Sequence, residues 1–344
     1  MKAVVYQGPG DIVVSNLPEP RVEERRDAVV RVTRSGICGT DLHPFRGELP
    51  DFAPGTVLGH EFAGVVVEAG PDAQVTVGER VFASDVVACG RCALCARGWH
   101  YQCPEATLFG YADVVGKPLS GGQAEYVRVP YADVVLRSVP EGVSDEQALF
   151  VSDVLTTAYT AVRAAALTPG DTVGVVGAGP VGLLAGRCAA IAGAGRVIVC
   201  DPASERRTAA ESLGLQVVVP GELGTALREA AGTRGAAAVI EAVGSDAALR
   251  AAVEAAGPRS TVVAAGAHHS SAMPFPTGLA FGRELTLRFT VGDPIALRED
   301  VLPLITQGLL DPSAVVTHRL PLSRAAEAYA LFDGRAALKV VLSP

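Results

Sequence analysis

A glycine-rich turn at residues 177–182 is the feature that most restricts what this chain can fold into. The stretch DTVGVVGAGPVGLLAG places Gly177, Gly179 and Gly182 in G-x-G-x-x-G spacing, after a β-branched run and before an apolar segment. In a strand–turn–helix unit, such glycines permit a tight turn, close approach of a pyrophosphate and close helix–strand packing. The motif is weak by itself, because a turn in any Ala/Gly-rich chain can have this spacing.

The alternation of strand-like and helical segments around this turn supports its interpretation as a dinucleotide-binding motif. After about residue 154, strand-like runs alternate with Ala-rich helical stretches. The predicted strands are 172–176, 196–200, 216–219, 236–240, 261–266 and 285–290, and the predicted helices lie near 180–194, 203–213, 221–231 and 246–256. This alternation predicts an α/β fold with a parallel sheet and crossover helices, and six strands make a complete dinucleotide-binding sheet.

An acidic residue favours NAD over NADP in such a sheet. Asp201 ends the second predicted strand, 19 residues after Gly182. A carboxylate there can accept both ribose hydroxyls and would repel a 2′-phosphate. Arg206 and Arg207 follow closely and weaken this preference. Asp201 is also explained as the N-cap of the helix that follows it.

The rest of the chain has a different character. Residues 1–150 are short β-branched runs punctuated by Gly and Pro, and the segment 292–344 ends in ALKVVL, another strand pattern. The 344 residues are enough for two domains. We therefore expect a β-rich domain beside the α/β domain.

Composition excludes several classes of partner. The net charge is −8 and the chain has only three lysines, which argues against nucleic acid binding. The uncharged glycine-rich stretch 172–186 has 15 residues, whereas a membrane helix needs about 20 apolar residues. The N-terminus lacks the apolar run of a signal peptide. We expect a cytoplasmic protein with neither nucleic acid nor membrane as a partner.

Four of the seven cysteines lie within residues 89–103, in the order C-x2-C-x2-C-x7-C. Clustering and an odd total fit metal ligation in a reducing compartment better than disulfides. Four thiolates form a closed tetrahedral shell without an open position, which predicts a structural zinc site. The proposed ligands are Cys89, Cys92, Cys95 and Cys103. His100 is an alternative ligand, and a nucleic-acid-binding zinc module is an alternative role.

A second, sparser set could hold a catalytic metal. Cys38, His60 and Asp153 combine thiolate, imidazole and carboxylate, a set that suits zinc and leaves a fourth position open. Each residue also has an ordinary explanation. A lone cysteine is commonly a core residue, a histidine can sit in a turn, and an aspartate can cap a helix.

Several motifs together resemble a known family. GICGTDLH, GHEFAGVVVEAG, the cysteine cluster, GAGPVG and ALKVVL occur in one fixed order along nearly the whole chain. The chain resembles the zinc-containing medium-chain alcohol dehydrogenases. LFGYADVVGKPLSGGQAEYVRVPYAD and SDVLTTAY are most similar to the formaldehyde-dehydrogenase-like branch.

The resemblance implies a domain arrangement. Residues 1–153 and 292–344 would form a GroES-like catalytic domain, with a structural zinc lobe at about 89–103. Residues 154–291 would form a Rossmann NAD-binding domain.

The resemblance also implies site roles. Cys38, His60 and Asp153 match the catalytic zinc ligands, and Glu61 matches a carboxylate that can approach the metal. Thr40 and His43 match a proton relay. The matching cofactor-binding residues are Gly177, Gly179, Pro180, Val181, Gly182, Asp201, Arg206 and Lys339. Two zinc ions per subunit and NAD(H) are therefore expected.

The implied activity is reversible hydride transfer between a primary or secondary alcohol and NAD. The alternative is a non-catalytic dinucleotide-binding sensor or structural protein of the same fold. Phe45 and Phe52 are expected either as walls of the substrate entrance or as core residues. Edge pairing of the segment 285–290 with its copy predicts a homodimer or homotetramer.

Overall fold

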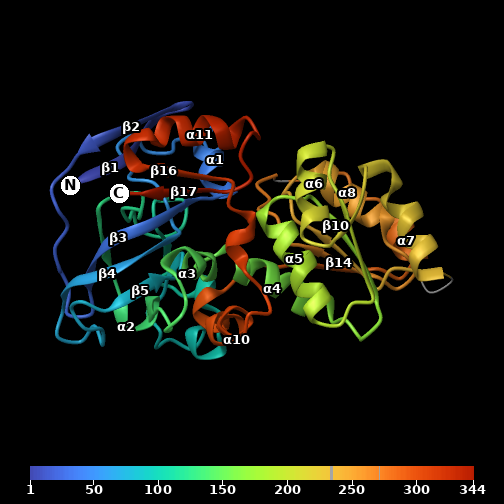
Figure 1. Ribbon diagram of the computed structural model, residues 1–344, viewed down its shortest axis with the longest axis horizontal. Helices are drawn as coiled ribbons and strands as arrows, with labels where there is room; N and C mark the ends of the chain where they lie inside the picture. Colours follow the sequence, from blue (N-terminus) through green and yellow to red (C-terminus); the bar gives the residue numbers. More distant parts are fainter. Residues whose placement is uncertain (233–234, 271) are drawn as a thin grey trace. The chain divides into compact units, whose positions relative to one another are not determined.

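The computed structural model describes residues 1–232, 235–270 and 272–344. The chain forms two compact units, which Figure 1 shows coloured along the sequence. The discontinuous unit comprises Met1–Asp153 and Asp293–Pro344, and the inserted unit comprises Val154–Gly292. Among the described residues, every helix is too short or too polar to cross a bilayer.

The inserted unit is built on a six-stranded parallel sheet. Its strands are β10 (Thr172–Val176), β11 (Arg196–Cys200), β12 (Gln216–Val218), β13 (Ala238–Glu241), β14 (Thr261–Ala264) and β15 (Thr286–Phe289). The spatial order is β12-β11-β10-β13-β14-β15, with parallel pairing throughout. This is the doubly wound order of a Rossmann fold, so the predicted α/β fold and all six of its strands are confirmed.

Helices cover the sheet because the central strands are apolar on both faces. All five residues of β10 are buried. The helices are α4 (Val154–Ala165), α5 (Pro180–Ile191), α6 (Ser204–Ser212), α7 (Leu223–Ala231), α8 (Asp246–Ala255) and α9 (Thr277–Gly282). Leu227 of α7 and Leu249 of α8 share a core with Val239 of β13. Helices α4 and α5 pack against each other. The crossovers bring each strand's C-terminal end, and the turn after it, to the same edge of the sheet.

The discontinuous unit is β-rich, as its sequence predicts. Its strands are β1 (Lys2–Gly8), β2 (Asp11–Asn16), β3 (Ala28–Ile37), β4 (Phe62–Ala69), β5 (Arg80–Ala83), β6 (Val86–Val87), β7 (Thr107–Leu108), β8 (Tyr126–Val129), β9 (Leu136–Ser138), β16 (His318–Pro321) and β17 (Val340–Ser343). Its α-helices are α1 (Gly39–Phe45), α2 (Ala132–Val135), α3 (Asp145–Val151), α10 (Pro294–Thr306) and α11 (Ala325–Asp333).

The two segments of this unit, 1–153 and 293–344, meet in one sheet. Its order is β16-β17-β3-β4-β5-β9, with β8 also paired to β3. Strand β17 runs antiparallel to β3, and Figure 1 shows the red C-terminal strand beside the blue one. Since β3 ends just before Cys38, this pairing brings the C-terminal segment close to the first proposed metal ligand.

The segment after Cys38 is helical. Its residues form α1, with Cys38 in extended conformation at its N-cap. Asp41 at the third helical position accepts a hydrogen bond from the Cys38 backbone N–H at 2.9 Å. This reciprocal cap ends β3 and begins α1, and it fixes the direction of the Cys38 side chain.

Candidate metal and cofactor sites

Four potential metal ligands converge in the discontinuous unit. Ligand atoms of Cys38, His60, Glu61 and Asp153 all lie within 4.8 Å of one another. Cys38 follows β3, His60 and Glu61 precede β4, and Asp153 follows α3. The fold therefore brings together residues that are 115 positions apart in the sequence.

The separations fit a tetrahedral metal ion. Asp153 Oδ2 lies 3.2 Å from Cys38 Sγ and 3.5 Å from His60 Nε2. Zinc bonds of about 2.0–2.3 Å at tetrahedral angles hold ligand atoms about 3.3–3.8 Å apart, so one separation lies within this range and the other just below it. The donor set and its spacing thus match a zinc ion bound by sulfur, nitrogen and oxygen.

Electrostatics around these residues favour a bound cation. Burial raises the pKa of the Cys38 thiol to about 12, and Asp153 and Glu61 add to the shift. Burial also raises the pKa of Glu61, against the effect of Lys339. Acidic groups packed in a site of low polarity are poorly solvated, and a divalent cation would stabilise their ionised forms.

The pKa values of His60 and Asp153 are shifted in opposite directions. Burial works to lower the pKa of His60, but the neighbouring carboxylates of Asp41 and Asp153 raise it well above its usual value. Burial disfavours the Asp153 carboxylate, yet its contacts with His60 lower its pKa to about 2. Without a metal, His60 therefore provides the positive charge that Asp153 needs.

Asp41 is a site residue that the sequence analysis missed. It is 1% exposed, and its Oδ1 lies 3.4 Å from His60 Nδ1. A carboxylate behind a metal-bound imidazole fixes the ring and its tautomer. The available signal was its position three residues after Cys38, where an acid also caps the helix.

Glu61 has a buried partner at the C-terminal end of the chain. The Lys339 Nζ donates to Glu61 Oε2, and both side chains are 1% exposed. Glu61 Oε1 has no hydrogen-bond partner among the described residues. One oxygen is therefore held by the lysine, and the other is free to face a metal. The expected contact of Lys339 with a pyrophosphate stays a prediction.

The proposed relay residues lie on α1. Thr40 is half-buried in its first turn. His43 lies in the last turn, and its Nδ1 is 2.5 Å from Glu48 Oε2. Its side chain is 17% exposed, so the imidazole can exchange protons with solvent.

The four-cysteine cluster is compact. Its Sγ–Sγ distances are 3.5 Å for Cys89–Cys103 and Cys92–Cys95, 3.9 Å for Cys92–Cys103 and 4.0 Å for Cys89–Cys95. Four bonds of about 2.3 Å to zinc place tetrahedral sulfurs about 3.8 Å apart. The thiols therefore fit one zinc ion.

Backbone N–H groups point at these sulfurs. Arg91 N donates to Cys89 Sγ at 3.5 Å, Cys95 N to Cys92 Sγ at 3.4 Å, and Glu105 N to Cys103 Sγ at 3.4 Å. Such bonds stabilise thiolates in metal clusters. His100, the alternative zinc ligand, contacts Asp293 instead. Its backbone N–H and its Nδ1 each lie 2.9 Å from the Asp293 carboxylate.

The glycine loop of the inserted unit has the geometry that its spacing predicts. Gly177 has φ +100°, and a Cβ on Gly182 would overlap the carbonyl oxygen of Gly177. Gly179 caps α5, with Pro180 as the first helical residue. A Cβ on Gly179 would meet only the Arg206 Nη1, 4.0 Å away. The helix N-terminus is thus open to a phosphate group.

Asp201 lies beside this loop. Its carboxylate is 4% exposed and accepts hydrogen bonds from the Ala178 and Ala203 backbone N–H groups, both at 2.9 Å. Arg206 Nη1 is 3.9 Å from Asp201 Oδ2. The structure therefore brings Asp201 and Arg206 to the loop, and it gives Asp201 a cap-like contact with Ala203.

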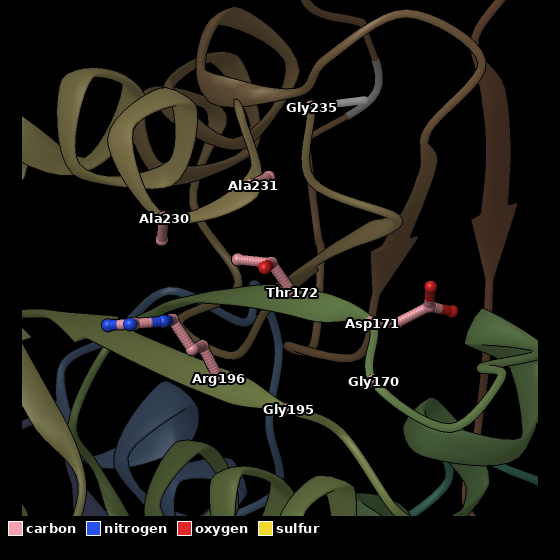
Figure 2. Close-up of a pocket in the computed structure, with 8 residues that line it drawn as sticks. All are labelled: Gly170, Asp171, Thr172, Gly195, Arg196, Ala230, Ala231 and Gly235. Carbon is pink, nitrogen blue, oxygen red and sulfur yellow. The ribbon is translucent and has the colours of Figure 1, made fainter. Parts of the chain in front are cut away.

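A cavity of about 170 Å³ lies at the N-terminal ends of β10 and β11, opposite the end that the glycine loop follows. It is lined by Asp171 and Thr172 at the start of β10 and by Arg196 at the start of β11, as Figure 2 shows. Since the glycine loop follows the other end of β10, this cavity is separate from the candidate cofactor site.

The aromatic residues considered as substrate walls pack within the core of the discontinuous unit. Phe52 is 5% exposed, with its ring centroid 5.0 Å from that of Tyr6. Phe45 packs against Tyr329, with 5.5 Å between centroids. Of the two expectations for these residues, the structure supports the core.

Family models match both parts of the chain. Residues 24–141 match the alcohol dehydrogenase GroES-like domain, and residues 180–307 match the zinc-binding dehydrogenase model. A "probable zinc-binding alcohol dehydrogenase" of Mycobacterium tuberculosis is 38% identical over 336 residues, which cover 97% of this chain and 86% of that protein.

Solved structures have the same fold. The alcohol dehydrogenase TADH from Thermus sp. ATN1 has a TM-score of 0.94 and 38% identity, covering 100% of this chain and 99% of that chain. A short chain alcohol dehydrogenase from Escherichia coli CFT073, complexed with NADH, has a TM-score of 0.85 and 28% identity, with coverage of 100% and 99%. The chain therefore belongs to the zinc-containing medium-chain alcohol dehydrogenase family, with a GroES-like and a Rossmann-type fold.

Proposed function

We propose that this chain is an NAD-dependent zinc alcohol dehydrogenase. It would transfer hydride reversibly between a primary or secondary alcohol and NAD, giving an aldehyde or ketone. The observation that carries the proposal is the convergence of Cys38, His60 and Asp153 at tetrahedral spacing. The resemblance to the formaldehyde-dehydrogenase-like branch leaves the substrate itself open.

These residues would hold the catalytic metal. With Cys38 and Asp153 ionised and His60 neutral, the ligand charges balance a divalent cation. When bound there, zinc supplies Lewis-acid chemistry that lowers the pKa of an alcohol hydroxyl, and the nicotinamide supplies the hydride acceptor. Glu61 would approach the metal through its free Oε1, while Lys339 holds its other oxygen.

The chain's own groups would then handle the proton. Thr40 follows Cys38 by two residues, and its hydroxyl would accept a proton from the alcohol while giving up its own. His43 would carry the proton toward solvent, with Glu48 supporting the imidazolium at 2.5 Å. The oriented carboxylate of Asp41 would keep His60 in the tautomer that leaves Nε2 free to bind metal.

NAD binding is assigned to the inserted unit. Gly177, Gly179, Pro180, Val181 and Gly182 would bind the pyrophosphate, since the loop is open at Gly179. Asp201 would accept the adenosine ribose hydroxyls, and Arg206 lies next to it. The NADH complex of the Escherichia coli neighbour supports a nicotinamide cofactor.

The remaining assignments follow from the same proposal. Residues 154–291 would be the NAD-binding domain, and residues 1–153 with 292–344 the catalytic domain. The four-cysteine cluster would hold a second, structural zinc. The protein would act in the cytoplasm on a small molecule.

Oligomerisation is proposed through the inserted unit. Strand β15 lies at the edge of its sheet. Phe289 at its end is 63% exposed, and Phe281 of α9 and Val291 after the strand are 88% and 60% exposed. An unpaired apolar edge favours pairing with a second copy in a homodimer or homotetramer.

The alternative is a non-catalytic dinucleotide-binding protein. Such a protein has no need to retain metal ligands, and the complete donor set of this chain therefore favours the enzyme. Metal content combined with NAD reduction on a panel of alcohols distinguishes the two.

The test of the mechanism is Cys38→Ser, with Cys188→Ser as the matched control in a buried helix of the inserted unit. Cys38→Ser is expected to abolish turnover while NADH still binds, and the control to retain activity. Near-normal kcat of Cys38→Ser in zinc-free buffer would contradict the zinc mechanism.

A further inference from the structure

The four-cysteine lobe touches a buried aspartate through one tyrosine. Tyr101 lies between Cys95 and Cys103, in the short 3-10 helix His100–Gln102. Its hydroxyl donates a hydrogen bond to Asp85 Oδ2. Asp85 is 4% exposed and comes directly before β6. This contact links the lobe to a residue that the proposed mechanism does not use.

Asp85 in turn holds the segment that carries Asp153. Its Oδ1 accepts from the Val86 backbone N–H at 2.7 Å, which fixes the carboxylate. Its own backbone N–H donates to the Ser152 carbonyl at 3.1 Å. Ser152 is fully buried and precedes Asp153. The path from the lobe to the proposed metal ligand therefore consists of two hydrogen bonds and one peptide unit.

The ligand needs such support because of where it lies. Only Ser152 and Asp153 separate the end of α3 at Val151 from the start of α4 at Val154. A shift of this short connection would move Asp153 Oδ2 relative to Cys38 Sγ and His60 Nε2, which lie 3.2 and 3.5 Å away. Metal affinity depends on such separations to within a few tenths of an ångström.

The lobe has an attachment that does not involve Tyr101. His100 is bound through its backbone N–H and ring to Asp293, which caps α10. The cysteine sulfurs keep their own backbone donors. Removing the Tyr101 hydroxyl should therefore leave the lobe folded and metal-bound.

We propose that Tyr101 and Asp85 are positioning residues that couple the four-cysteine lobe to Asp153, so that the lobe helps to hold this ligand at metal-binding distance. The inference rests on the proposed catalytic metal site. Coupling between two sites is reciprocal, so metal bound at either site strengthens binding at the other.

The test compares Tyr101→Phe with wild type and with Tyr131→Phe. The control tyrosine stacks on Arg26, with 4.7 Å from the guanidinium to the ring centroid. Its hydroxyl has no hydrogen-bond partner among the described residues. Each protein is prepared with zinc in the cysteine cluster and is titrated with Co²⁺ against a chelator. Visible absorption then reports the one-thiolate site of Cys38, His60 and Asp153.

In Tyr101→Phe, the Co²⁺ affinity of this site is expected to fall about fivefold or more, with shifted absorption bands. The variant should retain the zinc of the cysteine cluster, and Tyr131→Phe should match wild type. Equal affinities and spectra in Tyr101→Phe and wild type would overturn the inference alone. Loss of cluster zinc with unchanged Co²⁺ affinity would also overturn it. A wild-type protein that binds no Co²⁺ at this site would overturn the proposed function as well.

Discussion

Asp41 Oδ1 lies 3.4 Å from His60 Nδ1, and the two side chains are 1% and 2% exposed. The other oxygen of Asp41 accepts hydrogen bonds from the Cys38 backbone N–H at 2.9 Å and from Gln123 Nε2 at 3.3 Å. A single carboxylate therefore lies against two of the three proposed catalytic ligands. It joins the turn that ends β3 to the histidine that precedes β4.

Asp41→Asn is expected to weaken zinc binding at the catalytic site by about 10–100-fold. The amide retains an oxygen for the Cys38 N–H but loses the charge that faces His60. Chelator competition measures the affinity. Asp27→Asn is the matched control, because Asp27 is also 1% exposed but pairs with Arg128. An equal loss in both variants would contradict a specific role for Asp41.

Zinc binding to the metal-free catalytic site should release about two protons near neutral pH. Cys38 has its pKa raised to about 12 by burial, and carboxylates raise the pKa of His60 well above its usual value, so both hold a proton before binding. Asp153 is already ionised, because His60 lowers its pKa to about 2, and it therefore releases no proton on zinc binding. Affinity should therefore rise with pH, by up to about a hundredfold per pH unit.

Calorimetry in buffers of different ionisation enthalpy counts these protons. Cys38→Ser should release about one proton fewer, because the serine hydroxyl keeps its proton. A pH-independent affinity in the wild-type protein would contradict this account of the site.

Asp201→Ala should weaken NADH binding about tenfold or more and reduce the preference over NADPH. The variant removes charge-assisted hydrogen bonds to the ribose and the repulsion of a 2′-phosphate. Fluorescence titration with each cofactor measures both effects. Asp171→Ala is the control. The Asp171 carboxylate lies just before β10, away from the glycine loop, and accepts hydrogen bonds from the backbone N–H and hydroxyl of Thr168. An unchanged ratio of the two affinities would exclude the assigned role of Asp201.

Cys95→Ser should lower the midpoint of thermal unfolding by about 5 °C or more, in line with a loss of about 2 kcal/mol. The reason is that three thiolates bind the structural zinc less well than four. Cys188→Ser, which is also buried but lies outside the cluster, should retain the full zinc content. A Cys95→Ser protein that loses zinc only from the Cys38 site would refute the structural assignment.

The inserted unit was the most predictable part of the chain. The predicted strand at 172–176 corresponds to β10, and the one at 196–200 to β11. These runs are apolar because both faces of a parallel sheet are covered, so composition and period identify them. The spacing of Gly177, Gly179 and Gly182 likewise indicates a turn whose geometry is local.

The fifteen-residue cysteine cluster was predictable for the same reason. Ligands three or eight positions apart are restricted by the chain itself to a small volume, so their spacing is informative. Cys38, His60 and Asp153 have no such restriction, and the resemblance to a family was needed to group them. Only the pairing of β3 with β4, and the contacts of α3 with both strands, bring these ligands together.

The supporting contacts were beyond the sequence. Nothing in their spacing links Asp41 to His60, Lys339 to Glu61, or Tyr101 to Asp85. The sequence by itself determined the strand–helix alternation, the glycine turn and the cysteine cluster, because these depend on distances along a short stretch of chain. The tertiary structure alone decided which buried charges meet, because that depends on how all the strands and helices of a unit pack together.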